Sequence, residues 1–166
     1  MRAGLSPFKD HSATVLPEWI DDNGHMNLAY YVLVFDGATD VVCEAVGLGA
    51  THRRQTRTSV FAVETHILYR AELLLGDHVT VHSQIIAADA KRMHLAHEMH
   101  RNGDAVAFQE VMLLHVSLNT RRATPFPPGI TAQVSALAAD HAKLPRPAWL
   151  GRRLDWSPSN PSRGPP

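Results

Sequence analysis

The chain has 166 residues, of which 45% are hydrophobic and 19% are charged, so it is long enough for one domain with a buried core. Its 16 Lys and Arg balance its 16 Asp and Glu, and this neutrality argues against binding to nucleic acid or to an anionic membrane. A single cysteine, Cys43, excludes an internal disulfide and paired-cysteine metal or redox motifs. No apolar run is long enough for a secretory signal or a membrane span, and we expect a cytoplasmic protein.

The first predicted element is a short strand over residues 11–20. Pro17 lacks the N–H that a sheet ladder needs, which places this segment at a sheet edge or at the end of a strand. The turn sequence DDNG follows at residues 21–24. We therefore expect a strand that leads through a tight acidic turn into the next element.

A long helix is predicted from Asn27 onwards. Apolar residues recur there every three or four positions, which is the period of a helix with one buried stripe. The stripe consists of Leu28, Tyr31, Val32, Phe35, Ala38, Val42 and Val46. Asn27 or Asn23 is placed to cap the helix, and Gly47 and Gly49 are placed to end it after about twenty residues.

Four strands are predicted after a basic, exposed connection at residues 51–57. The segments with alternating or β-branched residues are 58–70, 78–88, 92–100 and 104–118. The Asn102-Gly103 pair is the strongest hairpin signal in the chain. One strand, a long helix and four strands in meander order predict an α+β fold, in which a curved five-stranded antiparallel sheet wraps around the helix.

The eleven histidines raise the question of a metal site. His94 and His97 are three residues apart, so in a strand they point to opposite faces. His94 and His100 share a face but lie about 19 Å apart along an extended strand. Neither spacing makes a metal site, and we expect no bound metal.

The C-terminal residues differ in composition from the rest of the chain. Residues 131–143 predict a short helix, and the segment after it is so rich in Pro, Ser and Gly that we expect it to be disordered. We therefore expect one domain over residues 1–130 and a C-terminal extension over residues 131–166.

The junction between the first strand and the helix carries a recognisable motif. The run Asp21-x-x-Gly24-His25-Met26-Asn27 resembles the signature of hot-dog acyl-CoA thioesterases of the 4-hydroxybenzoyl-CoA thioesterase type. The segments PEWID, VETHILY, LGD, V-x-V, DAKRMHL and MLLHV extend the likeness over roughly residues 12–128, and together they look most like betainyl-CoA thioesterases of carnitine catabolism. The resemblance implies a hot-dog fold, hydrolysis of an acyl-CoA, no cofactor beyond the CoA of the substrate, and a homodimer or dimer of dimers with shared sites.

The resemblance places the catalytic carboxylate at Asp21, as nucleophile or general base. Hydrolysis of a thioester also needs donors where the oxyanion develops, and we expect these from the free amides of Gly24, His25 or Met26 at the helix start. The helix dipole favours the ionised carboxylate. We expect Asn27 to cap the helix and fix the loop, and His25 either to orient the turn or to take a proton. The plainer alternative is that Asp21 is an ordinary turn carboxylate.

Glu64 is the second candidate carboxylate. In the alternation of the segment VFAVETHILY it lies on the face opposite Phe61 and Val63, which we expect to contact the core. Glu64 is therefore expected on a solvated or cleft-facing side. Its place in VETH matches the betainyl-CoA thioesterases, so it is either a residue that orients water or binds a substrate cation, or a plain exposed glutamate.

Aromatic residues flank the motif and are candidates for binding the acyl group. Trp19 and Tyr30 are placed to bind a trimethylammonium group on their ring faces. Tyr31 is a further candidate, but it lies on the buried stripe and is as well explained as core.

Basic residues are candidates for binding the phosphates of CoA. Lys91 and Arg92 in the DAKR turn, or Arg53 and Arg54 in the connection, carry suitable charges. The alternative is that these turns are simply solvated.

Two other functional classes remain open at this point. One is a non-catalytic module that binds acyl-CoA, and the other is a hot-dog dehydratase that acts on hydroxyacyl thioesters with His25 and Glu64. Release of free thiol separates both from a thioesterase, because neither binding nor dehydration releases CoA.

Overall fold

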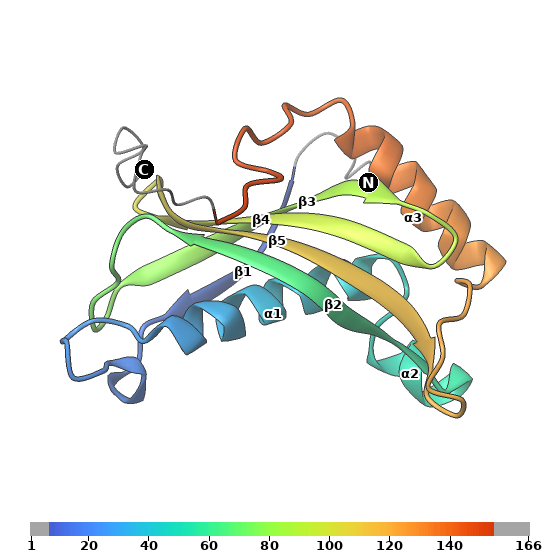
Figure 1. The fold of residues 1–166 in the computed structure, drawn as a ribbon, viewed down its shortest axis with the longest axis horizontal. Helices are drawn as coiled ribbons and strands as arrows, with labels where there is room; N and C mark the ends of the chain where they lie inside the picture. The colour runs from blue at the N-terminus through green and yellow to red at the C-terminus, as the bar shows by residue number, and fades with distance from the viewer. Residues whose placement is uncertain (1–6, 155–166) are drawn as a thin grey trace.

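One long helix lies in the concave face of a curved antiparallel sheet (Figure 1). The computed structural model describes residues 7–154. The strands are β1 (Phe8–Thr14), β2 (Thr58–Tyr69), β3 (His78–Ala88), β4 (Arg92–Arg101) and β5 (Asp104–Ser117). The helices are the 3₁₀ turn η1 (Pro17–Trp19), α1 (Leu28–Ala45), α2 (Ala50–Thr56) and α3 (Pro128–His141). The predicted α+β fold, with a five-stranded sheet around a long helix, is confirmed.

Helix α1 forms as its sequence pattern predicts. The Asn27 side chain accepts a hydrogen bond from the N–H of Ala29 at 3.0 Å, so Asn27 rather than Asn23 is the cap. The buried residues are Tyr31, Val34, Phe35, Ala38, Thr39, Val42 and Cys43, spaced three or four apart. Gly47 ends the helix with a φ of 80°, a conformation that favours glycine.

The strand order in the sheet is β1-β3-β4-β5-β2. Strands β3 to β5 form the predicted meander, but β2 pairs with β5 along its whole length and not with β3. The meander prediction is wrong for β2 because residues 70–77 between β2 and β3 do not form a tight hairpin, so nothing local enforces their pairing. As a result, β1 and β2 are the two edges of the sheet.

Two short elements differ from the sequence-based expectation. The first strand ends at Thr14, and Pro17 begins η1, where its missing N–H is not needed. Residues 51–57 were expected to form a connection but lie largely in α2, whose first amide, from Ala50, donates to the Glu44 carboxylate at 2.8 Å. Seven residues without an apolar stripe are too few to show a helical period.

The inner face of the sheet carries a buried polar contact to α1. His97 on β4 is fully buried, and its ring nitrogens lie 3.1 Å from Thr39 Oγ1 and 2.7 Å from Ser83 Oγ. Because Thr39 donates its own hydroxyl hydrogen to the Phe35 carbonyl, His97 Nε2 is the donor to Thr39 and Nδ1 accepts from Ser83. A neutral imidazole therefore links the helix to two strands.

Helix α3 closes part of the β3 edge. Strand β1 pairs with β3 only as far as Phe8 and Ser83, and beyond it the N–H of Ile85 donates to His141 Nδ1 at 2.8 Å. Val134 of α3 packs in the same core cluster as the end of α1. The helix begins three residues earlier than expected and spans residue 130, so the expected division at that residue falls inside a packed helix.

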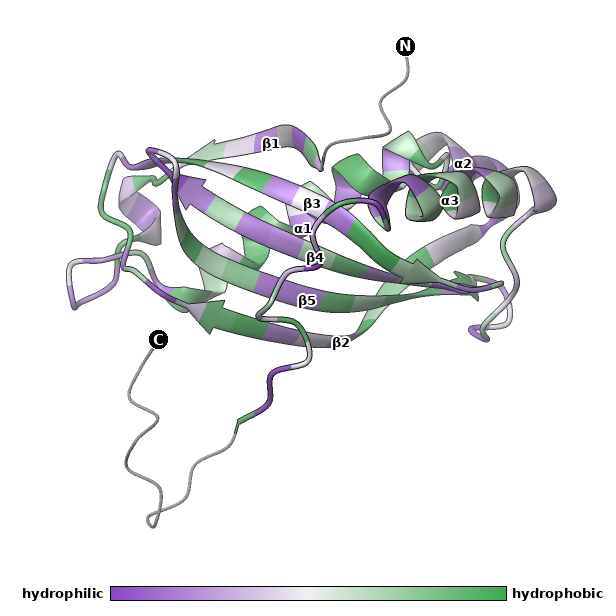
Figure 2. Ribbon diagram, turned by 90° about the horizontal axis from the view of Figure 1, so that it is seen from above, coloured by the Kyte–Doolittle hydropathy of each residue, from purple (hydrophilic) through white to green (hydrophobic). Residues whose placement is uncertain are grey.

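Residues 144–154 cross the outer face of the sheet, the face turned away from α1 (Figure 2). The Trp149 ring stacks on Phe108, and its indole N–H donates to Glu98 Oε1 at 2.9 Å. This segment is ordered by specific contacts. The disorder expected farther along falls mostly on residues 155–166, which lie outside the described residues.

Within residues 7–154, no helix is both long and apolar enough to cross a membrane. The same part of the chain holds no group of three or more His, Cys, Asp or Glu arranged to bind a metal ion.

Candidate active site

Residues 21–25 form a closed turn at the start of α1. The Asp21 N–H donates to the His25 carbonyl at 3.0 Å, and the Gly24 N–H donates to the Asp21 carbonyl at 2.9 Å. Gly24 has a φ of 81°, where a residue with a Cβ would be strained. The Asp21 carboxylate is held in turn by the N–H of Asn23, which donates to Oδ1 at 2.8 Å. The backbone thus determines where this carboxylate points.

The turn is anchored on both sides. The N–H of Met26 donates to the Leu73 carbonyl at 2.7 Å, in the loop that follows β2, and the Met26 side chain is buried in the core. The N–H of Asn27 donates to the Trp19 carbonyl at 2.9 Å. A turn fixed at both ends gives the preorganised geometry that a catalytic carboxylate requires.

Only one of the three expected oxyanion amides is free. The Gly24 and Met26 N–H groups are both used inside the fold, which removes two of the three alternatives Gly24, His25 or Met26. The N–H of His25, by contrast, has no acceptor within residues 7–154. The sequence shows which amides lie at the helix start, but not that the distant Leu73 carbonyl accepts from the Met26 N–H. His25 is therefore the amide that can face a ligand.

The Asp21 carboxylate is accessible and has spare acceptor capacity. Its side chain is 22% exposed, and the His25 ring nitrogen Nδ1 lies 3.9 Å from Oδ1. This separation is too long for a hydrogen bond, so the imidazole lies beside the carboxylate without binding it. An accessible carboxylate beside a free amide can attack a carbonyl or take a proton from water.

The flanking aromatic residues pack on protein. Trp19 and Tyr30 stack on one another with ring centroids 5.2 Å apart and planes 11° apart, so no cation can sit between them and only their outer faces remain. Tyr31 is 4% exposed, and its hydroxyl donates to the Ala71 carbonyl at 3.2 Å. The geometry of Tyr31 favours the core alternative.

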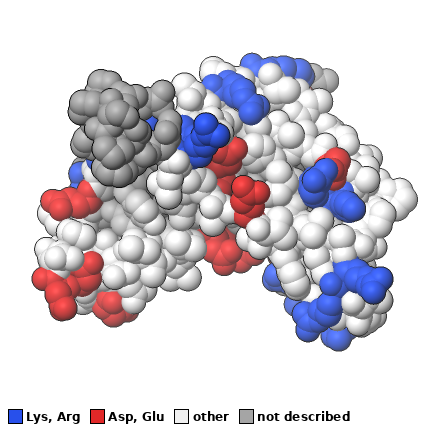
Figure 3. Space-filling view, viewed as in Figure 1, with Lys and Arg blue, Asp and Glu red and all other residues white. Residues whose placement is uncertain are grey.

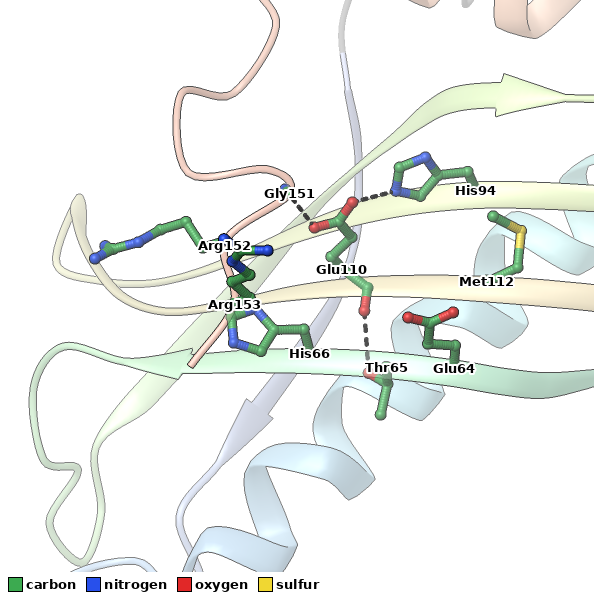
Figure 4. Close-up of a pocket in the computed structure, with 9 residues that line it drawn as sticks. All are labelled: Glu64, Thr65, His66, His94, Glu110, Met112, Gly151, Arg152 and Arg153. Atoms are coloured by element: carbon green, nitrogen blue, oxygen red, sulfur yellow. Dashed lines mark hydrogen bonds and ion pairs between the residues drawn. The ribbon is translucent and has the colours of Figure 1, made fainter. Parts of the chain in front are cut away.

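Glu64 lies on the outer face of the sheet, in a cavity of about 360 Å³ shared with His66, His94 and Glu110 (Figure 4). Glu110 is the centre of this group, since its carboxylate oxygens lie 2.7 Å from His94 Nε2 and accept from the Gly151 N–H at 2.7 Å. The structure does not bring Glu64 together with Asp21, because the Asp21 turn packs against α1 on the other side of the sheet.

The expectation that Phe61 and Val63 contact the core is wrong. They are 39% and 55% exposed. The pairing of β2 with β5 is irregular between Ala62 and Glu64, which interrupts the alternation. Within residues 7–154, β2 is also an edge strand without a second neighbouring strand.

The candidate phosphate ligands lie far from Asp21 in a single chain. The Asp21 turn adjoins the loop after β2, where Arg101 Nη1 donates to the Glu72 carbonyl. Arg92 is at the opposite end of β4, about 30 Å away along the strand, where it pairs with Asp89 at 2.6 Å. Lys91 lies in the same turn.

The basic helix α2 also lies away from the Asp21 turn. Figure 3 shows basic side chains gathered over α2 and acidic side chains at the other end of the molecule. Arg53 and Arg54 are both exposed on α2. No single chain therefore brings the predicted cations to the predicted carboxylate.

A second cavity, which the sequence did not reveal, lies between α1, β2 and β5 and has a volume of about 270 Å³. Its polar residues are Asp36, Thr39, Asp40, Arg53, Thr65 and Gln109. The one sequence feature that points to this cavity is the pair Asp36 and Asp40, which lie one helical turn apart beside the buried stripe of α1. Without the pairing of β2 with β5, no pattern could show that these carboxylates border a cavity.

Comparisons with known proteins identify the family of the chain. Residues 15–134 match the thioesterase-like superfamily. The chain is 40% identical over 150 residues to the betainyl-CoA thioesterase of Pseudomonas aeruginosa, which covers 89% of this chain and 94% of that protein. It is 36% identical over 149 residues to the L-carnitine dehydrogenase/betainyl-CoA thioesterase of Agrobacterium fabrum, covering 89% of this chain and 31% of that protein.

Among solved structures, a Staphylococcus aureus protein in complex with CoA matches with a TM-score of 0.85 at 29% identity, covering 95% of this chain and 100% of that chain. The chain thus belongs to the thioesterase-like superfamily. More narrowly, it is an acyl-CoA thioesterase with the hot-dog fold, as the motif at residues 21–27 implied.

Proposed function

We propose that this thioesterase hydrolyses betainyl-CoA to betaine and CoA, with Asp21 as the catalytic carboxylate. The observation that supports it best is the position of Asp21, an accessible carboxylate held in the same short turn, residues 21–25, as the free N–H of His25. The name of the 40% identical relative supports betainyl-CoA as the acyl donor.

The chemistry follows from these two groups. The thioester carbonyl oxygen accepts a hydrogen bond from the His25 N–H, which stabilises the negative charge that develops there. Asp21 either removes a proton from water as the water oxygen bonds to the carbonyl carbon, or attacks that carbon itself and is then released by water. In both routes the carbon–sulfur bond breaks and the thiolate of CoA leaves.

The alternatives are less well supported. A dehydratase would use His25 with Glu64 supplied across the dimer, and both would have to reach one substrate. Glu64 of either subunit opens on the outer face of the sheet, whereas His25 lies in the turn at the start of α1. A binding module without turnover has no need of an accessible carboxylate at a preorganised turn.

We propose further that the active form is a homodimer or a dimer of dimers, joined at the β2 edges. In a single chain the outer edge of β2 is unpaired. Exposed apolar residues gather on and beside it, namely Phe61, Val63 and Tyr69 on β2 and Leu28 and Val32 on α1. Antiparallel pairing of two β2 edges brings the acidic end of one chain to the basic α2 end of its partner, where the exposed Arg54 can meet the CoA phosphates (Figure 3).

We also propose a cytoplasmic location, supported by the lone Cys43, which is buried and forms no disulfide.

The experiment that tests the function is Asp21→Asn. The amide keeps the oxygen that accepts from the Asn23 N–H but cannot act as base or nucleophile, so the rate of thiol release from betainyl-CoA is expected to fall by at least about 100-fold. The matched control is Asp22→Asn, the exposed neighbouring aspartate, which is expected to stay within about threefold of the parent. Circular dichroism checks that both variants fold. Activity of Asp21→Asn within tenfold of the parent contradicts the proposal.

A further inference from the structure

The cavity between α1, β2 and β5 has a chemistry that the hydrolysis itself does not use. We propose that it binds the cationic end of the acyl group, a quaternary ammonium, through Asp36 and Asp40. This inference rests on the proposed function, since it specifies how that same substrate is recognised.

The cavity carries an excess of negative charge. Asp36 and Asp40 lie one helical turn apart on α1, where like charges destabilise a helix unless a cation is near. Among residues 7–154, Arg53 is the one cation in the lining, which leaves a net charge of about −1 across these three groups. The pKa of the Cys43 thiol, which also lines the cavity, is raised to about 12, chiefly by burial and to a smaller extent by the charge of Asp40. A bound monocation would neutralise the cavity.

The walls suit methyl groups. The apolar lining residues are Val32, Val60, Ala62, Val111 and Leu113. A quaternary ammonium carries its charge beneath methyl groups and has no N–H to donate, so an apolar lining with two carboxylates nearby can hold it without hydrogen bonds.

Gln109 is a second, independent sign of a ligand. Its side chain lines the cavity and is 5% exposed, and its Oε1 has no hydrogen-bond partner within the described part of the chain. A buried unpaired amide oxygen is costly unless something polar approaches it. A half-turn of the amide exchanges its oxygen and nitrogen, so the oxygen can face a cation that enters the cavity.

The volume of the cavity and its distance from Asp21 determine which chains can contribute to one site. The volume of about 270 Å³ is small for a whole cofactor but sufficient for a small headgroup. Asp36 lies eight residues beyond Leu28, about 12 Å along the helix from the start that carries Asp21. In a betainyl group only one carbon separates the ammonium nitrogen from the carbonyl, so the cavity and the Asp21 of its own chain cannot both contact one acyl group.

The proposed dimer resolves this separation. The Asp21 turn is at the Tyr69 end of β2, as the ring contact between Tyr31 and Tyr69 shows, whereas the cavity extends toward Val60 at the other end. Antiparallel pairing of two β2 edges exchanges these ends. The cavity of one chain then receives the ammonium while the partner subunit's Asp21 acts on the carbonyl.

The test compares two substrates of equal shape, betainyl-CoA and the uncharged 3,3-dimethylbutyryl-CoA, in which carbon replaces nitrogen. The parent is expected to prefer the cation, and in Asp36→Asn/Asp40→Asn the ratio of the two kcat/KM values is expected to fall by at least about tenfold. The control is Glu44→Gln, which removes a charge from the same helix outside the cavity and keeps an oxygen for the Ala50 N–H. It should leave the ratio within about twofold.

A parent that hydrolyses both esters equally, or a ratio that the double variant leaves unchanged, overturns the inference while the thioesterase assignment stands. A parent that hydrolyses neither ester overturns the proposed function itself. Gln109→Leu tests the cavity by a single change that alters no charge. If this variant loses the preference for betainyl-CoA but still hydrolyses the neutral ester, the result supports the cavity as the binding site.

A mixed dimer tests which chain supplies each group. Asp21→Asn and Asp36→Asn/Asp40→Asn chains, expressed together with different tags and purified as the mixed dimer, form one intact site if the cavity works with the partner subunit's Asp21. Betainyl-CoA activity is then expected to return to about half that of the parent. No recovery in the mixed dimer contradicts the shared site.

Discussion

Histidines on the two faces of the sheet have opposite environments. On β4, His97 points to the inner face, is fully buried and bridges Ser83 and Thr39. His94 is three residues earlier, points to the outer face and lies 2.7 Å from Glu110, with 18% of its side chain exposed. Burial lowers the pKa of His97 to about 3, so it is a neutral structural link. The position of a histidine relative to the core, rather than the number of histidines, decides what it does.

Removal of each imidazole ring in turn tests the difference between the two faces of the sheet. We expect His97→Ala to lower the free energy of unfolding by about 3 kcal/mol, because it leaves a cavity under α1 and an unpaired Ser83 hydroxyl. His94→Ala, on the outer face, is expected to lower it by less than about 1 kcal/mol. Urea unfolding measures both. Equal losses in the two variants contradict the distinction between the faces.

The pH dependence of stability gives a somewhat smaller effect. The pKa of His97 is lowered in the folded state, so the unfolded chain binds a proton below about pH 6.5 and the folded chain does not. The free energy of unfolding is therefore expected to fall as the pH drops from 6.5 toward 3, with about 2 kcal/mol lost between pH 7 and pH 5. Urea titrations at the two pH values measure the loss.

His97→Ala serves as the control for the pH experiment. His11, His52 and His82 also have pKa values lowered by burial, so the parent loses stability at several sites. The share that belongs to His97 is the part that disappears in the variant. An unchanged slope in His97→Ala assigns the effect to the other rings instead.

The smallest expected effect concerns Glu64 on the outer face. Because it shares its cavity with Glu110 and not with Asp21, Glu64→Gln is expected to keep thiol release from betainyl-CoA within about threefold of the parent. The comparison is with Asp21→Asn, assayed with the same ester. A loss close to that of Asp21→Asn would place Glu64 in the catalytic machinery, as one of its two sequence-based interpretations holds.

How much of the molecule the sequence predicts depends on whether a pattern is local. The period of α1 and the alternation of β3, β4 and β5 identify these elements because each buries one continuous face. The partner of β2 is set by its distant pairing with β5, which no local pattern encodes. The helix α2 has no buried residue and therefore no period.

The same distinction between local patterns and long-range pairing applies to the candidate active site. Asp21, Gly24 and Asn27 lie in one contiguous motif, so their grouping could be predicted. The engagement of the Met26 amide by Leu73, and the separation of Arg92 from the turn, depend on how the sheet is assembled. The cavity beside Asp36 depends on it as well, since its other wall comes from β2 and β5.

The contact of His141 with Ile85 has a consequence for growth of the sheet. Open strand edges allow chains to add one after another into fibres. One side of this sheet is blocked, because β1 is short, its pairing is irregular between Phe8 and His11, and α3 occupies the β3 edge beyond it. Within residues 7–154, the β2 side presents the long unpaired edge, so pairing at β2 in the proposed dimer would leave no open edge to which a further chain could add.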